Sequence, residues 1–186
     1  MNSLTANQVK EMLGLAPHPR EGGWFVRTYE ATETVAADQF ADSRYDGPRK
    51  TSTAIYYLLE PDTFSEMHCL ASDEVFHHYL GGAVEMLQLH PDGRSETLLI
   101  GPDLAAGQRP QVLVPRGVWQ GSRLLQAEGF ALLGCTVSPG FEFVDYQAAP
   151  REELIAKWPH EAELITKLTQ VPCGNNRRRA KAKGLL

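Results

Sequence analysis

The side chains best suited to chemistry are grouped in one short stretch, residues 68–81. His68 closes an extended run, Ala71-Ser72-Asp73 has the composition of a turn, and Glu74 opens a second extended run. A hairpin of this kind would aim His68 and Glu74 at one point. An imidazole and a carboxylate that converge inside a β-framework are suited to holding a metal or transferring a proton.

Two spacings resemble the motifs of the cupin superfamily. The run from His68 to Gly81 follows the first cupin motif, with Leu70 at the position of its second histidine. Residues 115–120, PRGVWQ, follow the second motif until Gln120 replaces its histidine. By this resemblance, two of the four usual ligand positions are kept and two are altered.

Further stretches narrow the resemblance to the cupin_5 group, a domain of unknown function. The resemblance covers roughly Leu13 to Tyr146 and implies a jelly-roll barrel with an internal pocket. It does not imply a settled reaction. The matching stretches are EGGW (21–24), TAIYYLL (53–59), DE (73–74), GQRP (107–110), VPRGVWQ (114–120) and GCTVSPGF (134–141).

The candidate site has His68 and Glu74 as its catalytic residues. Because pockets for small molecules are largely apolar with few polar groups, aromatic side chains should line it. The candidate ligand-binding residues are Gln120, His77, Tyr57, Phe76 and Trp119.

The alternation of side chains along a strand and the resemblance to the cupin_5 group point to different histidines after Glu74. In a strand, residues two apart share a face, which places His78 with Glu74. The resemblance points instead to His77, three residues after the Glu. A β-bulge would reconcile the two, and we rank His77 slightly above His78.

The altered positions favour chemistry without a metal or other cofactor. Leu70 removes one donor, and Gln120 offers only a neutral amide oxygen. The site resembles metal-free cupins that epimerise or isomerise sugar nucleotides, so we expect acid–base chemistry on a polar metabolite such as a sugar or nucleotide derivative. Two alternatives stay open: a cupin oxygenase or isomerase that holds a divalent metal through His68, Glu74 and His77, and a ligand-binding barrel without turnover. The sequence leaves open whether the protein is an enzyme.

Many short strands separated by turns predict an all-β jelly roll between about Trp24 and Tyr146, with flanking helices. A capping box begins a helix over 6–13, and prolines begin helical segments within 151–168. Residues 31–50 are turn-rich and read as a loop. We expect one cupin domain over residues 1–169. The predicted strands are 24–30, 51–59, 64–70, 74–80, 83–89, 95–100, 111–115, 119–125, 130–137 and 142–146.

The amino-acid composition limits the kinds of binding partner that we expect. The net charge of −5 argues against nucleic acid, although residues 170–186 carry five basic side chains and read as a disordered tail. The sequence shows no apolar run long enough for a membrane helix and no secretory signal, so we expect neither a membrane location nor export. Its three cysteines form no CxxC pair, which favours the cytoplasm. A small-molecule ligand is expected, and the resemblance to dimeric cupins implies a homodimer.

Overall fold

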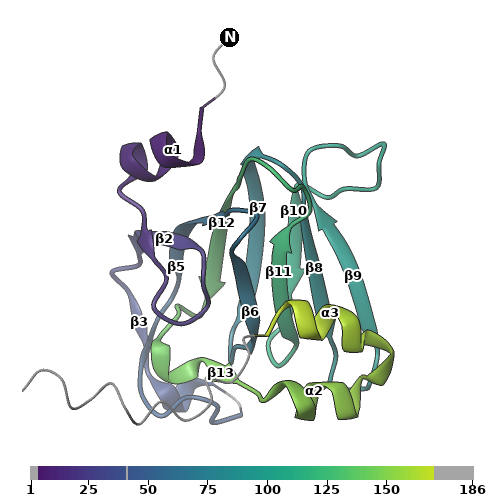
Figure 1. Ribbon diagram of the computed structural model, residues 1–186. Helices are drawn as coiled ribbons and strands as arrows, with labels where there is room; N and C mark the ends of the chain where they lie inside the picture. The colour runs from purple at the N-terminus through teal and green to yellow at the C-terminus, as the bar shows by residue number, and fades with distance from the viewer. Residues whose placement is uncertain (1–3, 41, 170–186) are drawn as a thin grey trace, which may run out of the picture.

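The computed structural model describes residues 4–40 and 42–169, and its core is a pair of facing β-sheets (Figure 1). The larger sheet has the order β1-β2-β5-β12-β7-β10, and the smaller has the order β13-β6-β11-β8-β9. The all-β jelly-roll prediction is confirmed, as a sandwich of two sheets. The strands are β1 (Ala16–Pro17), β2 (Trp24–Glu30), β3 (Thr34–Val35), β4 (Arg49–Lys50), β5 (Thr53–Leu59), β6 (Phe64–Cys69), β7 (Asp73–Gly81), β8 (Val84–Leu89), β9 (Ser95–Ile100), β10 (Gln111–Val114), β11 (Trp119–Leu124), β12 (Ala131–Ser138) and β13 (Gln147–Ala148).

Helices flank the sheets at both ends of the described chain, as predicted. Helix α1 (Ala6–Leu13) begins with the expected capping box, in which Thr5 and Gln8 bond reciprocally, and ends at a left-handed Gly14. Helices α2 (Arg151–Lys157) and α3 (Ala162–Lys167) follow β13 and are joined by a 3₁₀ turn, η3 (Pro159–Glu161). Among the described residues, no helix is long and apolar enough to cross a membrane.

The interior between the sheets is apolar along most of its length. Val84, Met86 and Leu133 are fully buried there. The outer face of the smaller sheet is covered by α2 and α3, whose Trp158 is 1% exposed and packs in a second apolar cluster with Met67. Each sheet therefore has a defined inner face, and this fixes which residues of a strand can reach a common site.

The prediction of a strand over residues 142–146 is wrong. Phe143–Asp145 form a 3₁₀ turn, η2, before the short strand β13. A 3₁₀ turn brings residues three apart to the same side, so Phe143 and Tyr146 both face the interior while Asp145 bonds to Arg49. An extended strand would turn Phe143 and Tyr146 to opposite faces. Residues 31–50, expected as a loop, include η1 (Ala37–Gln39) and the small β3–β4 sheet. The predicted disordered tail, 170–186, lies outside the described residues.

Candidate functional site

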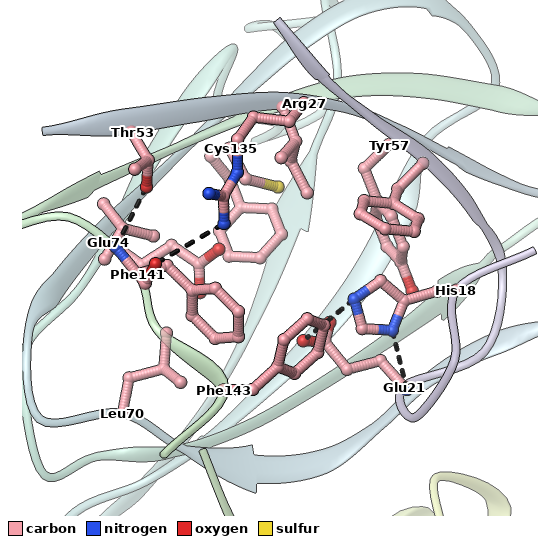
Figure 2. A pocket seen from close by; sticks show the side chains of 14 residues that line it. His18, Glu21, Arg27, Thr53, Tyr57, Leu70, Glu74, Cys135, Phe141 and Phe143 are labelled. Atoms are coloured by element: carbon pink, nitrogen blue, oxygen red, sulfur yellow. Dashed lines mark hydrogen bonds and ion pairs between the residues drawn. The ribbon is translucent and has the colours of Figure 1, made fainter. Parts of the chain in front are cut away.

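A narrow cavity lies beside the apolar core and is walled mainly by inner-face residues of the larger sheet (Figure 2). The space open to the centre of a water molecule is about 40 Å³, which is room for a few ordered waters. The site in this conformation therefore suits a small or thin chemical group. The lining residues are His18, Glu21, Phe25, Arg27, Thr53, Ile55, Tyr57, Leu70, Glu74, Phe76, Cys135, Val137, Phe141 and Phe143.

Glu74 is a buried carboxyl group on the wall of this cavity. It lies at the start of β7 and is 6% exposed, and Gln120 Nε2 donates a hydrogen bond to its Oε2. Burial, reinforced by the nearby carboxyl of Glu21, raises the pKa of Glu74 to about 7. Glu74 can therefore both hold and release a proton near neutral pH.

His68 lies behind the cavity wall, 1% exposed, with its ring stacked on Tyr146 at 5.0 Å between centroids. Its Nδ1 is 2.7 Å from the carbonyl oxygen of Glu66, so Nδ1 carries the hydrogen and donates it. Nε2 is therefore the acceptor, and it lies 3.3 Å from Gln120 Nε2. Burial lowers the pKa of His68, in keeping with a neutral ring.

Gln120 joins the two predicted catalytic residues. Gln120 on β11 and His68 on β6 are directly paired in the smaller sheet, and Glu74 reaches them from β7 of the larger sheet. Both hydrogens of one amide nitrogen are thus directed at His68 Nε2 and Glu74 Oε2. The structure brings His68, Glu74 and Gln120 together, but only Glu74 of the three lines the cavity.

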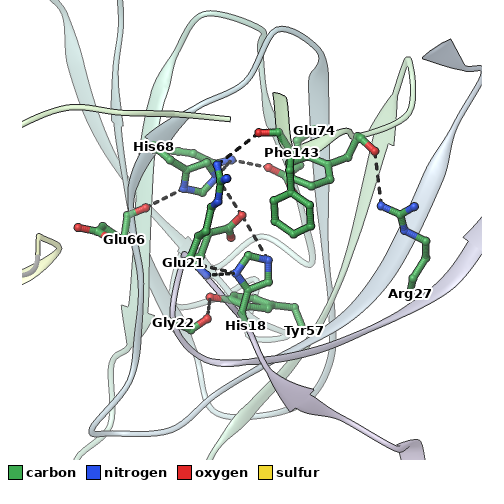
Figure 3. A network of polar contacts seen from close by, with 12 residues as sticks. His18, Glu21, Gly22, Arg27, Tyr57, Glu66, His68, Glu74 and Phe143 are labelled. Atoms are coloured by element: carbon green, nitrogen blue, oxygen red, sulfur yellow. Dashed lines mark hydrogen bonds and ion pairs between the residues drawn. The ribbon is translucent and has the colours of Figure 1, made fainter. Parts of the chain in front are cut away.

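The segment before β2 supplies two cavity residues that were not predicted, His18 and Glu21. His18 Nδ1 accepts hydrogen bonds from the backbone N–H groups of Glu21 at 2.9 Å and Arg20 at 3.4 Å, so Nε2 carries the hydrogen. Figure 3 shows Glu21 lying between two imidazoles, with its Oε1 3.7 Å from His18 Nε2 and 3.9 Å from His68 Nε2. Burial raises the pKa of Glu21 and lowers that of His18.

Two glycines allow this segment to enter the cavity. Gly22 and Gly23 have φ of 89° and 67°, and the Tyr57 hydroxyl donates to the Gly22 carbonyl at 2.9 Å. A Cβ on Gly22 would lie 2.5 Å from the Phe64 carbonyl oxygen. The turn that the EGGW stretch predicts therefore positions Glu21 in the site of its own chain.

Gly22→Ala is expected to cost more stability than a glycine replacement that meets only an unfavourable φ. Gly107 has φ of 77° with open space around it, so Gly107→Ala should cost about 1–2 kcal/mol of unfolding free energy. Gly22→Ala should exceed that loss because backbone must also move away from Phe64. Urea unfolding of the two variants measures the difference, and equal losses would show that the contact with Phe64 imposes no constraint.

A strap formed by residues 141–146 closes one side of the cavity. Phe141 and Phe143 line it, and Tyr146 covers His68. The strap is anchored by a buried bidentate ion pair, in which Arg49 Nε and Nη2 donate to the two carboxylate oxygens of Asp145 at 2.8 and 2.7 Å. The small β3–β4 sheet, which contributes Arg49, thus positions aromatic side chains at the site.

Three of the predicted ligand-binding residues do not line the cavity: Gln120, His77 and Trp119. Glu74 and Phe76 face inward, so His77 faces outward, where it stacks on Tyr79. Trp119 faces outward because its neighbour Gln120 faces inward, and it packs against the apolar cluster beneath the C-terminal helices. His78 also lies off the cavity wall, with Nε2 3.0 Å from the Gly82 carbonyl oxygen. Tyr57 and Phe76 do line the cavity.

The donor set does not fit a metal ion. The amide hydrogens of Gln120 are directed at the lone pairs of His68 and Glu74 that a metal would use, Leu70 offers no donor, and His77 faces the other side of the sheet. Within residues 4–40 and 42–169, no three His, Cys, Asp or Glu side chains are grouped as metal ligands.

The chain is similar to proteins without an assigned activity. Residues 7–149 match the family model described as Cupin superfamily (DUF985). An uncharacterised protein of Saccharomyces cerevisiae is 31% identical over 134 residues, covering 68% of this chain and 67% of the yeast protein. A crystal structure of a Shewanella oneidensis protein shares 34% identity with a TM-score of 0.78, covering 90% of this chain and 99% of that one. A hypothetical protein from Leishmania major shares 27% identity with a TM-score of 0.78, covering 90% and 100%.

Proposed function

The chain belongs to the Cupin_5 family of the cupin superfamily, and from this premise we propose that its cavity carries out proton transfer on a small polar metabolite without a metal. The observation that supports the proposal most is the placement of two carboxyl groups, Glu74 and Glu21, and the imidazole of His18 on the wall of one cavity. Polar groups that exchange protons, surrounded by apolar walls, are typical of acid–base sites.

Glu74 is the proposed base. In its ionised form it takes a proton from a substrate carbon beside a carbonyl group, and the C–H electron pair moves to the carbonyl oxygen as an enolate. Return of a proton to the opposite face of the same carbon restores the carbonyl and completes an epimerisation. Where that carbon bears a hydroxyl group, the proton can instead return to the former carbonyl carbon; the hydroxyl group then loses its proton and becomes the new carbonyl, which completes an isomerisation. Gln120 and His68 are positioning residues for Glu74. Glu21 is a second carboxyl group on the cavity wall that can hold or return a proton, and its Oε1 lies 3.7 Å from His18 Nε2.

The cavity favours a substrate smaller than a nucleotide derivative. A diphosphate is usually held by several Arg or Lys side chains, whereas the cavity wall contains one, Arg27. Its guanidinium already donates to Glu30 at 2.8 Å. A compact polar metabolite, such as a small sugar derivative, suits this lining better.

Deuterium incorporation tests the proposal. The protein, treated with a chelator, is incubated in heavy water with a panel of small polar metabolites, and exchange at carbon is followed by NMR. We expect exchange into at least one compound, unchanged by the chelator and lost in Glu74→Gln. Exchange that requires added metal, or that persists in Glu74→Gln, would refute the proposal. Binding without exchange would identify a ligand-binding barrel instead.

We also propose that the protein forms a homodimer through a groove of exposed apolar side chains on the outer face of the larger sheet. The groove includes Met12, 70% exposed, and Tyr79 and Leu80, nearly half exposed. Sedimentation at micromolar concentration should show a two-chain species. Leu80→Lys should shift it to one chain, whereas Leu104→Lys, at an exposed side chain that does not line the groove, should not. A single-chain species for the unmodified protein would rule out the dimer.

A further inference from the structure

The charges of the cavity do not balance, and this points to the class of ligand that it accepts. Glu21 and Glu74 both line the cavity, and within the described residues neither is bonded to an Arg or Lys side chain. A buried carboxylate without a positive partner is costly. When both groups ionise, the cavity carries negative charge that the surrounding protein leaves uncompensated.

The two imidazoles near these carboxyl groups are held in neutral forms. Protonation of His18 would place a hydrogen on Nδ1, which already accepts two backbone N–H groups. Protonation of His68 would place a hydrogen on Nε2, which already faces an amide hydrogen of Gln120. Neither ring can become a cation without losing these hydrogen bonds.

The two arginines nearest the cavity are occupied elsewhere. Arg27 lies at the cavity wall with its guanidinium bonded to Glu30 and close to the Phe141 carbonyl. The guanidinium carbon of Arg20 lies 5.3 Å from the ring centre of Phe143 and 5.7 Å from that of Tyr146. Both guanidinium groups therefore neutralise or stack on groups other than the two cavity carboxyls.

The remaining walls are suited to a cation. Five aromatic rings line the cavity, and the faces of such rings attract ammonium groups. The Tyr57 hydroxyl donates to the Gly22 carbonyl and the Thr53 hydroxyl accepts from the Phe141 N–H, so carboxyl oxygens are the main hydrogen-bond acceptors left for a ligand. The rings are Phe25, Tyr57, Phe76, Phe141 and Phe143.

We infer that the metabolite of this cavity carries a small organic ammonium group, held between Glu21 and Glu74 and against the aromatic rings. The inference rests on the proposed function and specifies the substrate class of the same site. An ammonium group beside a C–H bond also makes that bond more acidic, which suits proton removal by a carboxylate. Binding of the cation favours the ionised form of both carboxyl groups, so uptake of the ligand should release protons.

Three probes of similar size and different charge test the inference: propylammonium, 1-propanol and propionate. Binding to the full-length protein is followed by amide chemical shifts of cavity residues such as Cys135 and Val137, and proton release by calorimetry in two buffers of different ionisation enthalpy. Propylammonium should bind at least tenfold more tightly than the other two and release protons at pH 6.5. Its affinity should rise about tenfold from pH 6 to pH 8 as Glu74 ionises.

Variants separate the site from the general charge of the protein. Glu74→Gln and Glu21→Gln should each weaken propylammonium binding about tenfold or more, and Glu74→Gln should flatten the pH dependence. Glu163→Gln, at a carboxyl 84% exposed on α3, should change neither. Tighter binding of 1-propanol or propionate, lost in Glu74→Gln, would overturn the ammonium class and leave the proposed proton-transfer site standing. Binding of propylammonium that is unaffected by both cavity variants, or no binding at all, would overturn the inference. The proposed function would then be tested separately by the deuterium-exchange experiment.

Discussion

Replacement of Glu74 by Gln is expected to stabilise the protein at neutral and alkaline pH while abolishing proton transfer. Gln keeps the shape of the side chain and can still accept the hydrogen bond from Gln120. It removes a buried charge that the fold must otherwise accommodate. A residue kept at a cost to stability is typical of a functional site.

The stability gain should depend on pH in a defined direction. Glu74 has a pKa of about 7 in the folded chain against a reference value of 4.5. Between these values the unfolded chain has lost a proton that the folded chain still holds, so this group makes stability fall as pH rises. Relative to the unmodified protein, Glu74→Gln should gain nothing below about pH 4.5 and roughly 3 kcal/mol above pH 7.

Urea unfolding of both proteins from pH 4 to pH 8.5 measures this difference. His18 and His68 have lowered pKa values, which make stability rise with pH up to the ordinary histidine range. They are present in both proteins, so their contribution largely cancels in the comparison. A difference that is independent of pH would mean that Glu74 titrates with the same pKa in the folded and unfolded chains, as an ordinary exposed carboxyl group does.

Arg49→Met is expected to produce the largest loss of stability among single changes at the strap. It leaves Asp145, 8% exposed, as a buried charge without its two-bond partner. Breaking a buried ion pair from one side typically costs about 3–5 kcal/mol. Because Asp145 anchors the strap, the contact between Tyr146 and His68 should loosen as well, and this is visible in the ring signals of His68 by NMR.

Two comparisons isolate the role of the pair. The double variant Arg49→Met/Asp145→Leu should recover much of the loss, since neither charge is then left buried alone. Arg94→Met breaks an ion pair with Asp92 whose side chains are 67% and 57% exposed, and it should change the unfolding free energy little, because exposed ion pairs contribute little to stability. If Arg49→Met were as mild as Arg94→Met, the strap would not depend on this anchor.

The grouping of His68, Glu74 and Gln120 could be predicted because two short sequence motifs place these residues. His68 and Glu74 flank one turn, and the motif around Gln120 places that residue opposite His68 in the sheet. The fold followed from the alternation and turns of many short strands. These features are local in the sequence, and strand pairing then places the side chains concerned on the same face of a sheet.

Strand alternation explains why His77 and Trp119 lie away from the cavity. Trp119 and Gln120 are neighbours in one strand, so only one of them can face the cavity. The same holds for Phe76 and His77. A bulge does occur in β7, but it follows His78 and leaves the alternation from Glu74 to His77 intact.

His18 and Glu21 were missed because long-range contacts bring them to the site. The Glu21 carbonyl accepts from the Glu66 N–H at 2.8 Å, and the Tyr57 hydroxyl holds Gly22 from 35 residues away. Strand periodicity gives no information about such contacts. The EGGW stretch was the available signal, but the resemblance gave it no role in the site.

The account depends most on the ability of Glu74 to exchange a proton near neutral pH without a metal. The direct measurement is a carbon-13 NMR titration of the glutamate side-chain carboxyl groups in chelator-treated protein, with the Glu74 signal assigned by its absence in Glu74→Gln. The account predicts a titration midpoint near pH 7. A midpoint near 4.5, the value of an ordinary glutamate, would contradict it.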